Sequence, residues 1–138
     1  MPSPTKETWK NIANDFEQFW QFPHCVGTID GKHVAIQAPP NRGSLFFNYR
    51  KRHSIVLLAV VVDVGAYGRQ SDGVLSHSTF GHLLKNDALS LPESQPICGT
   101  GAASIPYVFV GDEAFPLRHN LMRPYPGRNL PLDKRIYN

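Results

Sequence analysis

The sequence feature that constrains the fold most is residues 54–64 (SIVLLAVVVDV), a nearly unbroken run of aliphatic and β-branched residues. A run of this kind is typical of a strand that is buried on both faces of a sheet. It is too short for a membrane span, which needs roughly 18–20 apolar residues, and the chain has no longer apolar run. We therefore predict a central strand in a domain with no membrane partner.

The beginning of the chain predicts a helix that leads into this domain. Ser3 can cap the helix, and Pro4 suits its first turn. Four large apolar residues then recur at helical spacing, namely Trp9, Ile12, Phe16 and Phe19. Pro23 closes the pattern, because proline cannot continue the hydrogen-bond ladder of a helix. We assign residues 1–21 to this helix and residues 22–138 to the domain.

Two further strands are each predicted to end on an aspartate. Residues 25–29 read as a short strand that stops at the turn dipeptide Asp30-Gly31, and residues 107–111 read as a buried strand that stops at Asp112. Ligand sites of open α/β sheets lie at the ends of strands. Both carboxylates are therefore candidates for a shared site.

The other segments complete an α/β pattern. Residues 33–37 alternate like a half-buried strand, and residues 78–91 have apolar residues in a loosely helical spacing. Residues 116–138 are punctuated by prolines and predict a mostly irregular tail. The order of these elements favours the α/β fold class.

Two aspartates on neighbouring strands can bring their carboxylates close together. Without a cation the like charges repel, and one carboxyl group would take up a proton. A divalent cation removes that conflict, and hard oxygen ligands suit Mg²⁺ or Mn²⁺. Two such ions can activate water and stabilise the leaving oxygen of a phosphodiester. However, Asp30-Gly31 and Gly111-Asp112 are also ordinary turn dipeptides, and spacing alone favours that interpretation.

Four stretches of the chain carry a family resemblance. They are residues 22–39 (FPHCVGTIDGKHVAIQAP), 47–61 (FNYRKRHSIVLLAVV), 62–72 (VDVGAYGRQSD) and 107–126 (YVFVGDEAFPLRHNLMRPYP). The most specific motifs are IDGKHV and GDEAFPL. In this order the stretches resemble the Harbinger-type transposase-derived nucleases of the DDE superfamily, and the resemblance covers nearly the whole chain from Trp9 onward.

The resemblance implies a ribonuclease-H-like mixed sheet with flanking helices, and cleavage of phosphodiester bonds in DNA with Mg²⁺ or Mn²⁺. Matched motif by motif, the first catalytic and metal-binding aspartate is Asp30 and the second is Asp112. The resemblance also implies that the protein works on DNA in the nucleus, with the cytoplasm as a second location. The DNA-binding module that precedes this domain in the family has no counterpart here, so we expect a separate DNA-binding partner protein.

Two departures from the family pattern modify these expectations. The family's third catalytic acid is a glutamate on a later arginine-rich helix that this sequence lacks, and Glu113 cannot replace it because it adjoins Asp112. Family members also have a turn and part of a strand where this chain joins Val61 directly to Val62. We therefore expect an incomplete fold, with a shortened central hairpin and no last catalytic helix, and impaired cleavage. Two alternatives stay open: a non-catalytic remnant that binds DNA or protein, and a small-molecule phosphohydrolase.

A basic cluster provides a candidate nucleic-acid contact. Arg50, Lys51 and Arg52 stand among aromatic residues and can neutralise backbone phosphates. A solvated basic loop explains the cluster equally well. Three more arginines that can contact DNA are spaced through the tail, namely Arg118, Arg123 and Arg128. The formal charge of +3 favours an anionic partner only weakly, and the six histidines lack zinc-ligand spacing.

Overall fold

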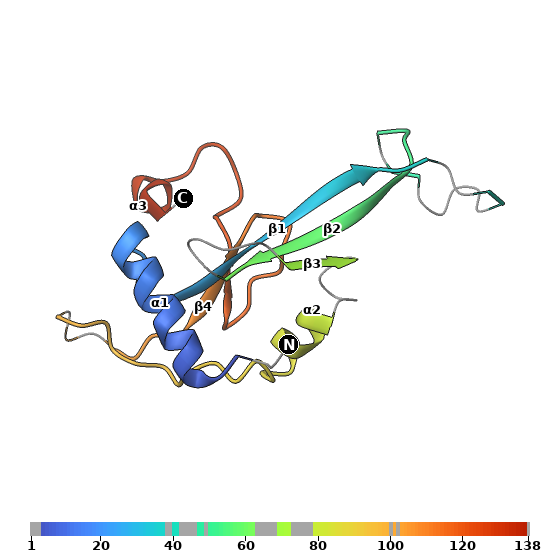
Figure 1. Cartoon of the computed structure of the whole chain (residues 1–138). Coiled ribbons are helices and arrows are strands. Elements are labelled where there is room, and N and C mark those ends of the chain that lie inside the picture. Colours follow the sequence, from blue (N-terminus) through green and yellow to red (C-terminus); the bar gives the residue numbers. More distant parts are fainter. Residues whose placement is uncertain are drawn as a thin grey trace.

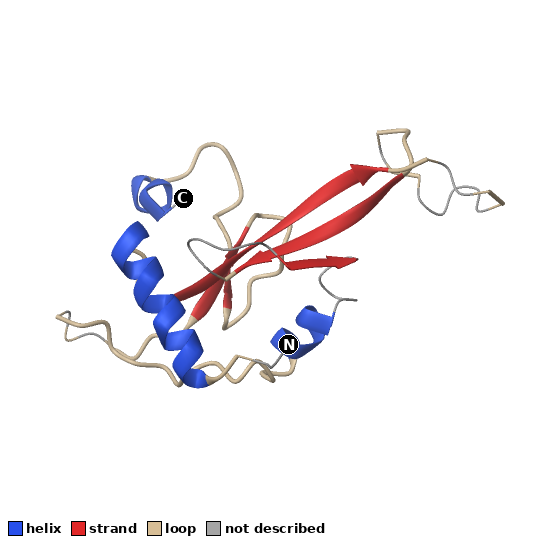
Figure 2. Cartoon of the chain, viewed as in Figure 1, coloured by secondary structure: helices blue, strands red, loops and turns tan. Residues whose placement is uncertain are grey.

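The computed structural model describes residues 4–37, 40–41, 47–48, 50–62, 69–72, 79–99, 101 and 103–137. Its elements, in chain order, are α1 (Lys6–Trp20), β1 (Cys25–Ala35), β2 (Ser54–Val61), β3 (Arg69–Asp72), α2 (Thr79–Lys85), β4 (Val108–Gly111), β5 (Leu121–Met122) and α3 (Leu132–Tyr137). The strands gather in one twisted sheet (Figure 1), and Figure 2 shows how much of the remaining chain is loop. The predicted α/β class is confirmed.

The five strands form a single mixed sheet in the order β3-β2-β1-β4-β5. β1 pairs antiparallel with β2, from Thr28 opposite Val61 to Ala35 opposite Ser54. β2 pairs antiparallel with β3, whereas β1 with β4 and β4 with β5 are parallel pairs. β1 is therefore the strand at which the sheet changes from antiparallel to parallel pairing.

β1 runs without a break through Asp30-Gly31, so the predicted turn at this dipeptide is wrong. The ladder to β2 continues across it, with Asp30 opposite Ala59. Pairing with β2 provides hydrogen bonds for the backbone N–H and C=O groups that a turn would otherwise bond locally. A glycine inside a strand lowers its stability but does not prevent it. The two strands predicted at residues 25–29 and 33–37 are one strand of 11 residues.

α1 begins and ends with local caps. The N-cap is Thr5, whose side chain accepts a hydrogen bond from the Thr8 N–H at 3.2 Å; the predicted cap, Ser3, lies outside the described residues. At the other end Gln21 adopts a left-handed conformation, with φ of 53°, and its N–H donates to the Glu17 carbonyl oxygen at 2.9 Å. None of the helices in the described ranges is long and apolar enough to cross a membrane.

The buried face of α1 takes in three of the four apolar residues that recur at helical spacing in the sequence. Trp9, Ala13 and Phe16 are buried, and Ile12 packs partly buried against the core. Phe19, the fourth, is 67 % exposed. The stripe follows positions four and seven residues after Trp9, which share one helical face, and Phe19 lies off that face.

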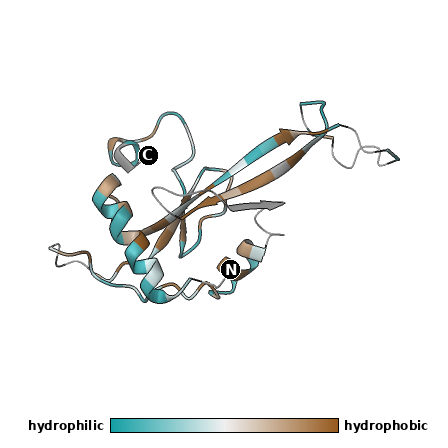
Figure 3. Ribbon diagram, in the orientation of Figure 1, coloured by the Kyte–Doolittle hydropathy of each residue, from teal (hydrophilic) through white to brown (hydrophobic). Residues whose placement is uncertain are grey.

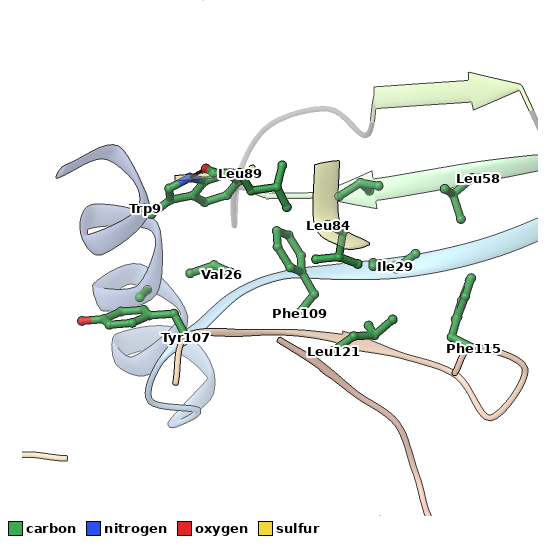
Figure 4. Packing of buried hydrophobic residues seen from close by; sticks show 12 residues of the cluster. Trp9, Val26, Ile29, Leu58, Leu84, Leu89, Tyr107, Phe109, Phe115 and Leu121 are labelled. Atoms are coloured by element: carbon green, nitrogen blue, oxygen red, sulfur yellow. Dashed lines mark hydrogen bonds between the residues drawn. The ribbon is translucent and has the colours of Figure 1, made fainter. Parts of the chain in front are cut away.

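The core packs against one face of the sheet, with contributions from α1 and α2 (Figure 4). Phe109 at its centre has no exposed surface, and the rings of Trp9 and Phe80 meet it edge-on at centroid distances of 5.7 Å and 5.2 Å. Trp9 also donates its indole N–H to the Leu89 carbonyl oxygen at 2.8 Å. Such ring pairs contribute about 0.5–1.5 kcal/mol each beyond their burial, so Phe109 joins both helices to the sheet.

β2 is buried mainly on one face, and the prediction of full burial on both faces is only partly right. Leu58 and Val60 lie in the core, whereas Leu57 and Ala59 on the other face are half-buried. β3, with four residues, is the antiparallel hairpin partner of β2. The junction where we expected a shortened hairpin continues into residues 63–68, which lie outside the described residues.

Two other segments depart from the predicted pattern. α2 ends at Lys85, well before the predicted end at residue 91, and the backbone then has positive φ at Asp87 (51°) and Ser90 (54°). Such left-handed positions interrupt a right-handed helix. The tail predicted to be irregular contains β5 and α3.

Candidate acidic site

Asp30 lies in β1, and Asp112 directly follows β4, the strand that pairs with β1. β1 and β4 pair in parallel with Ile29 opposite Gly111, and each aspartate is the next residue along its chain. Because paired strands lie about 4.8 Å apart, this register brings both aspartates to the same end of the parallel ladder. β4 leaves the sheet at this point while β1 continues, so the acid pair stands where the parallel ladder ends.

Side-chain alternation places Asp30 on the face opposite the core. Ile29 is buried in the core, and successive side chains of a strand point to opposite faces. Thr28 and Val110 are partners in the ladder, and both line a groove on that opposite face. Asp30 and Asp112 follow them by two residues, and both are exposed. Figure 3 shows β1 turning from hydrophobic at its start to hydrophilic through its middle.

The loop after β4 holds Asp112 in a defined turn. Its Oδ1 accepts a hydrogen bond from the Ala114 N–H at 2.9 Å, and its carbonyl oxygen accepts one from the Phe115 N–H at 3.2 Å. Phe115 is buried and folds back over Gly111, where an added Cβ would lie 2.6 Å from the ring atom Cδ2. The GDEAF part of the sequence motif thus has a physical meaning: a glycine makes room for the ring that anchors the aspartate's loop.

Arg123 clamps the same loop. Its Nη1 donates to the carbonyl oxygens of Glu113 at 3.2 Å and Phe115 at 3.1 Å. The sequence interpretation of Arg123 as a DNA contact missed this role. No sequence pattern marks it, because the arginine binds backbone carbonyls that any residue type would present.

An apolar groove of about 380 Å³ adjoins the acid pair on the same face. Its lining residues are Phe16, Trp20, Phe22, Cys25, Thr28, Val61 and Val110. Burial raises the pKa of the Cys25 thiol to about 11, partly offset by a hydrogen bond to the backbone at Gly27. A thiol that stays protonated is a poor nucleophile and a poor metal ligand, which argues against either role for Cys25.

The three basic residues predicted to contact DNA do not join the acid pair. Arg50, Lys51 and Arg52 are exposed in the connection between β1 and β2, at the end of the hairpin far from Asp30 (Figure 1). Any DNA contact that they make is therefore at a distance from the acids.

The molecule is thus an α/β domain with a mixed sheet and two exposed acids at the end of its β1–β4 ladder. The family model described as "DDE superfamily endonuclease" matches residues 29–138, and the chain belongs to that family. The match begins inside β1 and includes both Asp30 and Asp112. The predicted membership of the DDE superfamily is confirmed.

A curated relative is similar over most of the chain. It is "Protein ALP1-like" from Arabidopsis thaliana, which is 29 % identical over 138 aligned residues, covering 92 % of this chain and 34 % of that protein. The chain thus spans about a third of the length of the curated relative that it matches. No solved structure matches the chain.

Proposed function

We propose that this chain is a transposase-derived nuclease domain of the Harbinger type, built to hydrolyse phosphodiester bonds in DNA at Asp30 and Asp112 with Mg²⁺ or Mn²⁺, and that cleavage by this chain is impaired. The observation that carries the proposal is the parallel register of Ile29 with Gly111, because it brings the next two residues to the same end of the parallel ladder. Membership of the DDE superfamily endonucleases supports the chemistry. The strand order, three antiparallel strands followed by two parallel ones, is consistent with a ribonuclease-H-like fold.

The acid pair fits a hard divalent ion, with a limited set of ligands. Asp30 and Asp112 are exposed and offer carboxylate oxygens, and the Ala114 N–H occupies one oxygen of Asp112 and fixes its direction. When two divalent ions bind such a site, they activate water and stabilise the leaving oxygen. Among the described residues no group of three or more His, Cys, Asp or Glu side chains could hold a metal ion. We therefore propose weak binding, of the order of millimolar.

Calorimetric titration with MnCl₂ tests the metal site. We expect weak binding by the unmodified chain and its loss in Asp30→Asn and Asp112→Asn, since each change removes a charged ligand. Asp15→Asn, at an exposed position of α1, is the matched control and should leave binding unchanged. Tight binding that survives both site substitutions would place the metal elsewhere and overturn the assignment.

A plasmid-nicking assay with Mn²⁺ tests the reaction. We expect little or no nicking, because two carboxylates hold a pair of ions poorly. Any nicking should disappear in Asp30→Asn and persist in Asp15→Asn. Nicking that does not depend on Asp30 would contradict the proposed function.

The two-carboxylate set also favours a second candidate, a non-catalytic domain that binds DNA or a partner protein. This candidate predicts DNA binding without nicking, both with and without Mn²⁺. Nuclear residence and a separate DNA-binding partner protein belong to both candidates, because each acts on chromosomal DNA. Imaging of the tagged chain tests the location: exclusion from the nucleus would count against both.

A further inference from the structure

The positive charge of this chain is concentrated in one stretch. Residues 31–62, between Asp30 and Asp63, contain five of the 14 lysines and arginines and none of the 11 acids. The rest of the chain has nine basic residues against 11 acids, an excess of two negative charges. The five cations are Lys32, Arg42, Arg50, Lys51 and Arg52. A net charge near +3 thus conceals a strongly basic segment on an otherwise slightly acidic chain.

The described part of this stretch forms a projecting hairpin, which we name the basic arm: β1 beyond Asp30, residues 47–48 and 50–53 at the turn, and β2. Among the described strands, β4 pairs with β1 only as far as Ile29, and β3 pairs with β2 only as far as Leu57. Beyond these points the arm is two-stranded and extends away from α1 and the core (Figure 1). Arg50, Lys51 and Arg52, near its end, are therefore presented at a distance from the acid pair.

Asn48 organises the end of the arm. Its Oδ1 accepts hydrogen bonds from the N–H groups of Arg50 at 2.9 Å and Arg52 at 3.2 Å, and its Nδ2 donates to Ser54 Oγ at 2.7 Å. Its backbone N–H donates to the Arg52 carbonyl oxygen at 2.8 Å, and its carbonyl oxygen accepts from Lys51 N at 3.0 Å. Phe47 and His53 close the turn with a bridge and an edge-on ring contact at 5.3 Å.

The turn therefore carries three exposed cations on a fixed backbone. Arg50, Lys51 and Arg52 are all exposed, and Lys51 has a left-handed φ of 57° that the surrounding hydrogen bonds support. A turn that is ordered before binding loses less conformational entropy when it meets a ligand. A row of cations without intervening acids matches the phosphate backbone of a nucleic acid.

We propose that the basic arm binds the phosphate backbone of duplex DNA beside the cleavage point, with Asn48 as its positioning residue. This inference rests on the proposed function for the choice of DNA. From Ala59, opposite Asp30, to Ser54 is five residues, or about 17 Å of antiparallel strand, and the turn lies beyond it. At about 3.4 Å per base pair, the arm contacts phosphates about five to seven base pairs from the acid pair. Lys32, two residues beyond Asp30 and on the same face, lies along that path.

Fluorescence anisotropy of a labelled 30-base-pair duplex, without divalent metal, measures binding independently of cleavage. The triple variant Arg50→Gln/Lys51→Gln/Arg52→Gln should lower the slope of log affinity against log salt by about 2.7, since each lost phosphate contact contributes about 0.9. The matched control is Lys6→Gln/Lys85→Gln/Arg135→Gln, which removes the same charge at exposed positions outside the arm. An equal loss in both variants would overturn the proposal, because it would reflect net charge alone.

Asn48→Ala separates positioning from charge. It removes no cation, so we expect affinity to fall several-fold while the salt slope stays unchanged. An unchanged affinity would overturn the positioning role. If circular dichroism finds the triple variant unfolded, the single variant Lys51→Gln, at an exposed tip position, should lower the slope by about 0.9.

The remaining outcomes separate the arm from the acidic site. Nicking that depends on Asp30 together with DNA binding that ignores the arm variants would overturn the arm and leave the proposed function intact. Arm-dependent DNA binding without nicking would support the arm and favour the non-catalytic candidate. Tighter binding to a duplex RNA of the same length would overturn DNA as the arm's partner.

Discussion

Replacing Gly111 with alanine should damage both the stability of the domain and the acidic site. The added Cβ would lie 2.6 Å from Cδ2 of Phe115, whereas carbon atoms in good contact stand about 3.5–4.0 Å apart. The ring or the strand must therefore move by about 1 Å. Phe115 is 8 % exposed and packed in the core, so the movement has little room. Overpacking of this kind costs about 1–3 kcal/mol.

Thermal unfolding followed by circular dichroism measures the cost. For a domain of this size, 1–3 kcal/mol corresponds to a fall in Tm of about 3–10 °C. The substitution should also weaken Mn²⁺ binding, because Phe115 and Asp112 belong to one hydrogen-bonded turn. Mn²⁺ affinity should fall more in Gly111→Ala than in a control variant that is equally destabilised by a substitution away from the turn.

A double-mutant cycle with Phe115→Ala isolates the clash. Phe115→Ala alone should cost about 3–5 kcal/mol through the cavity that it leaves. In that background Gly111→Ala should cost close to nothing, because the obstacle is gone, which gives a coupling free energy of about 1–3 kcal/mol. If Gly111→Ala costs the same with and without the ring, Phe115 is not the reason for glycine at this position.

The remaining predictions concern the core and the two thiols. Trp9→Phe should lower the free energy of unfolding in urea by about 1–2 kcal/mol, because it leaves the Leu89 carbonyl without its indole donor, whereas Trp20→Phe, at a 68 % exposed position, should have little effect. A thiol reagent at pH 8 should modify the exposed Cys98 quickly and the buried Cys25 only after denaturant is added; equal rates would contradict the burial of Cys25. Burial raises the pKa of Cys25 from 9.0 to about 11, so the stability that its protonated thiol contributes is complete below about pH 9 and is lost as the pH rises towards 11. The free energy of unfolding in urea should therefore fall less between pH 8 and pH 10.5 in Cys25→Ala than in the unmodified chain.

The sequence predicted helices and strands well where apolar residues followed one clear pattern, either helical spacing or an unbroken apolar run. The apolar run at residues 54–64 contains β2, and the spacing from Trp9 to Phe16 marks α1. Asp30-Gly31 misled, because the dipeptide suits a turn in isolation, and only the ladder to β2 keeps it extended. β5 could not be predicted, because its two residues are a strand only by virtue of pairing with β4.

The site was predictable as a pair of residues and not as a structure. Motif resemblance singled out Asp30 and Asp112, and strand order made their proximity plausible, but the register that aligns them depends on the parallel pairing. The observed roles of Arg123 and Asn48 were not predicted, for a different reason. Both side chains bond largely to backbone atoms. Every residue type has these atoms, so the sequence contains no partner residue that would mark the contact.

The parallel pairing of β1 with β4 also fixes the order in which this domain can fold. The ladder of β1 with β2 starts from Ala35 and Ser54, which stand 19 positions apart, whereas Ile29 and Gly111 stand 82 positions apart. Closing the longer loop costs more chain entropy, and distant strand pairs form late. During synthesis the hairpin therefore emerges and closes first, while the two aspartates meet only after β4 has left the ribosome. We expect the nascent chain to have its basic arm before it has its acid pair, so that affinity for polyanions precedes any capacity for cleavage.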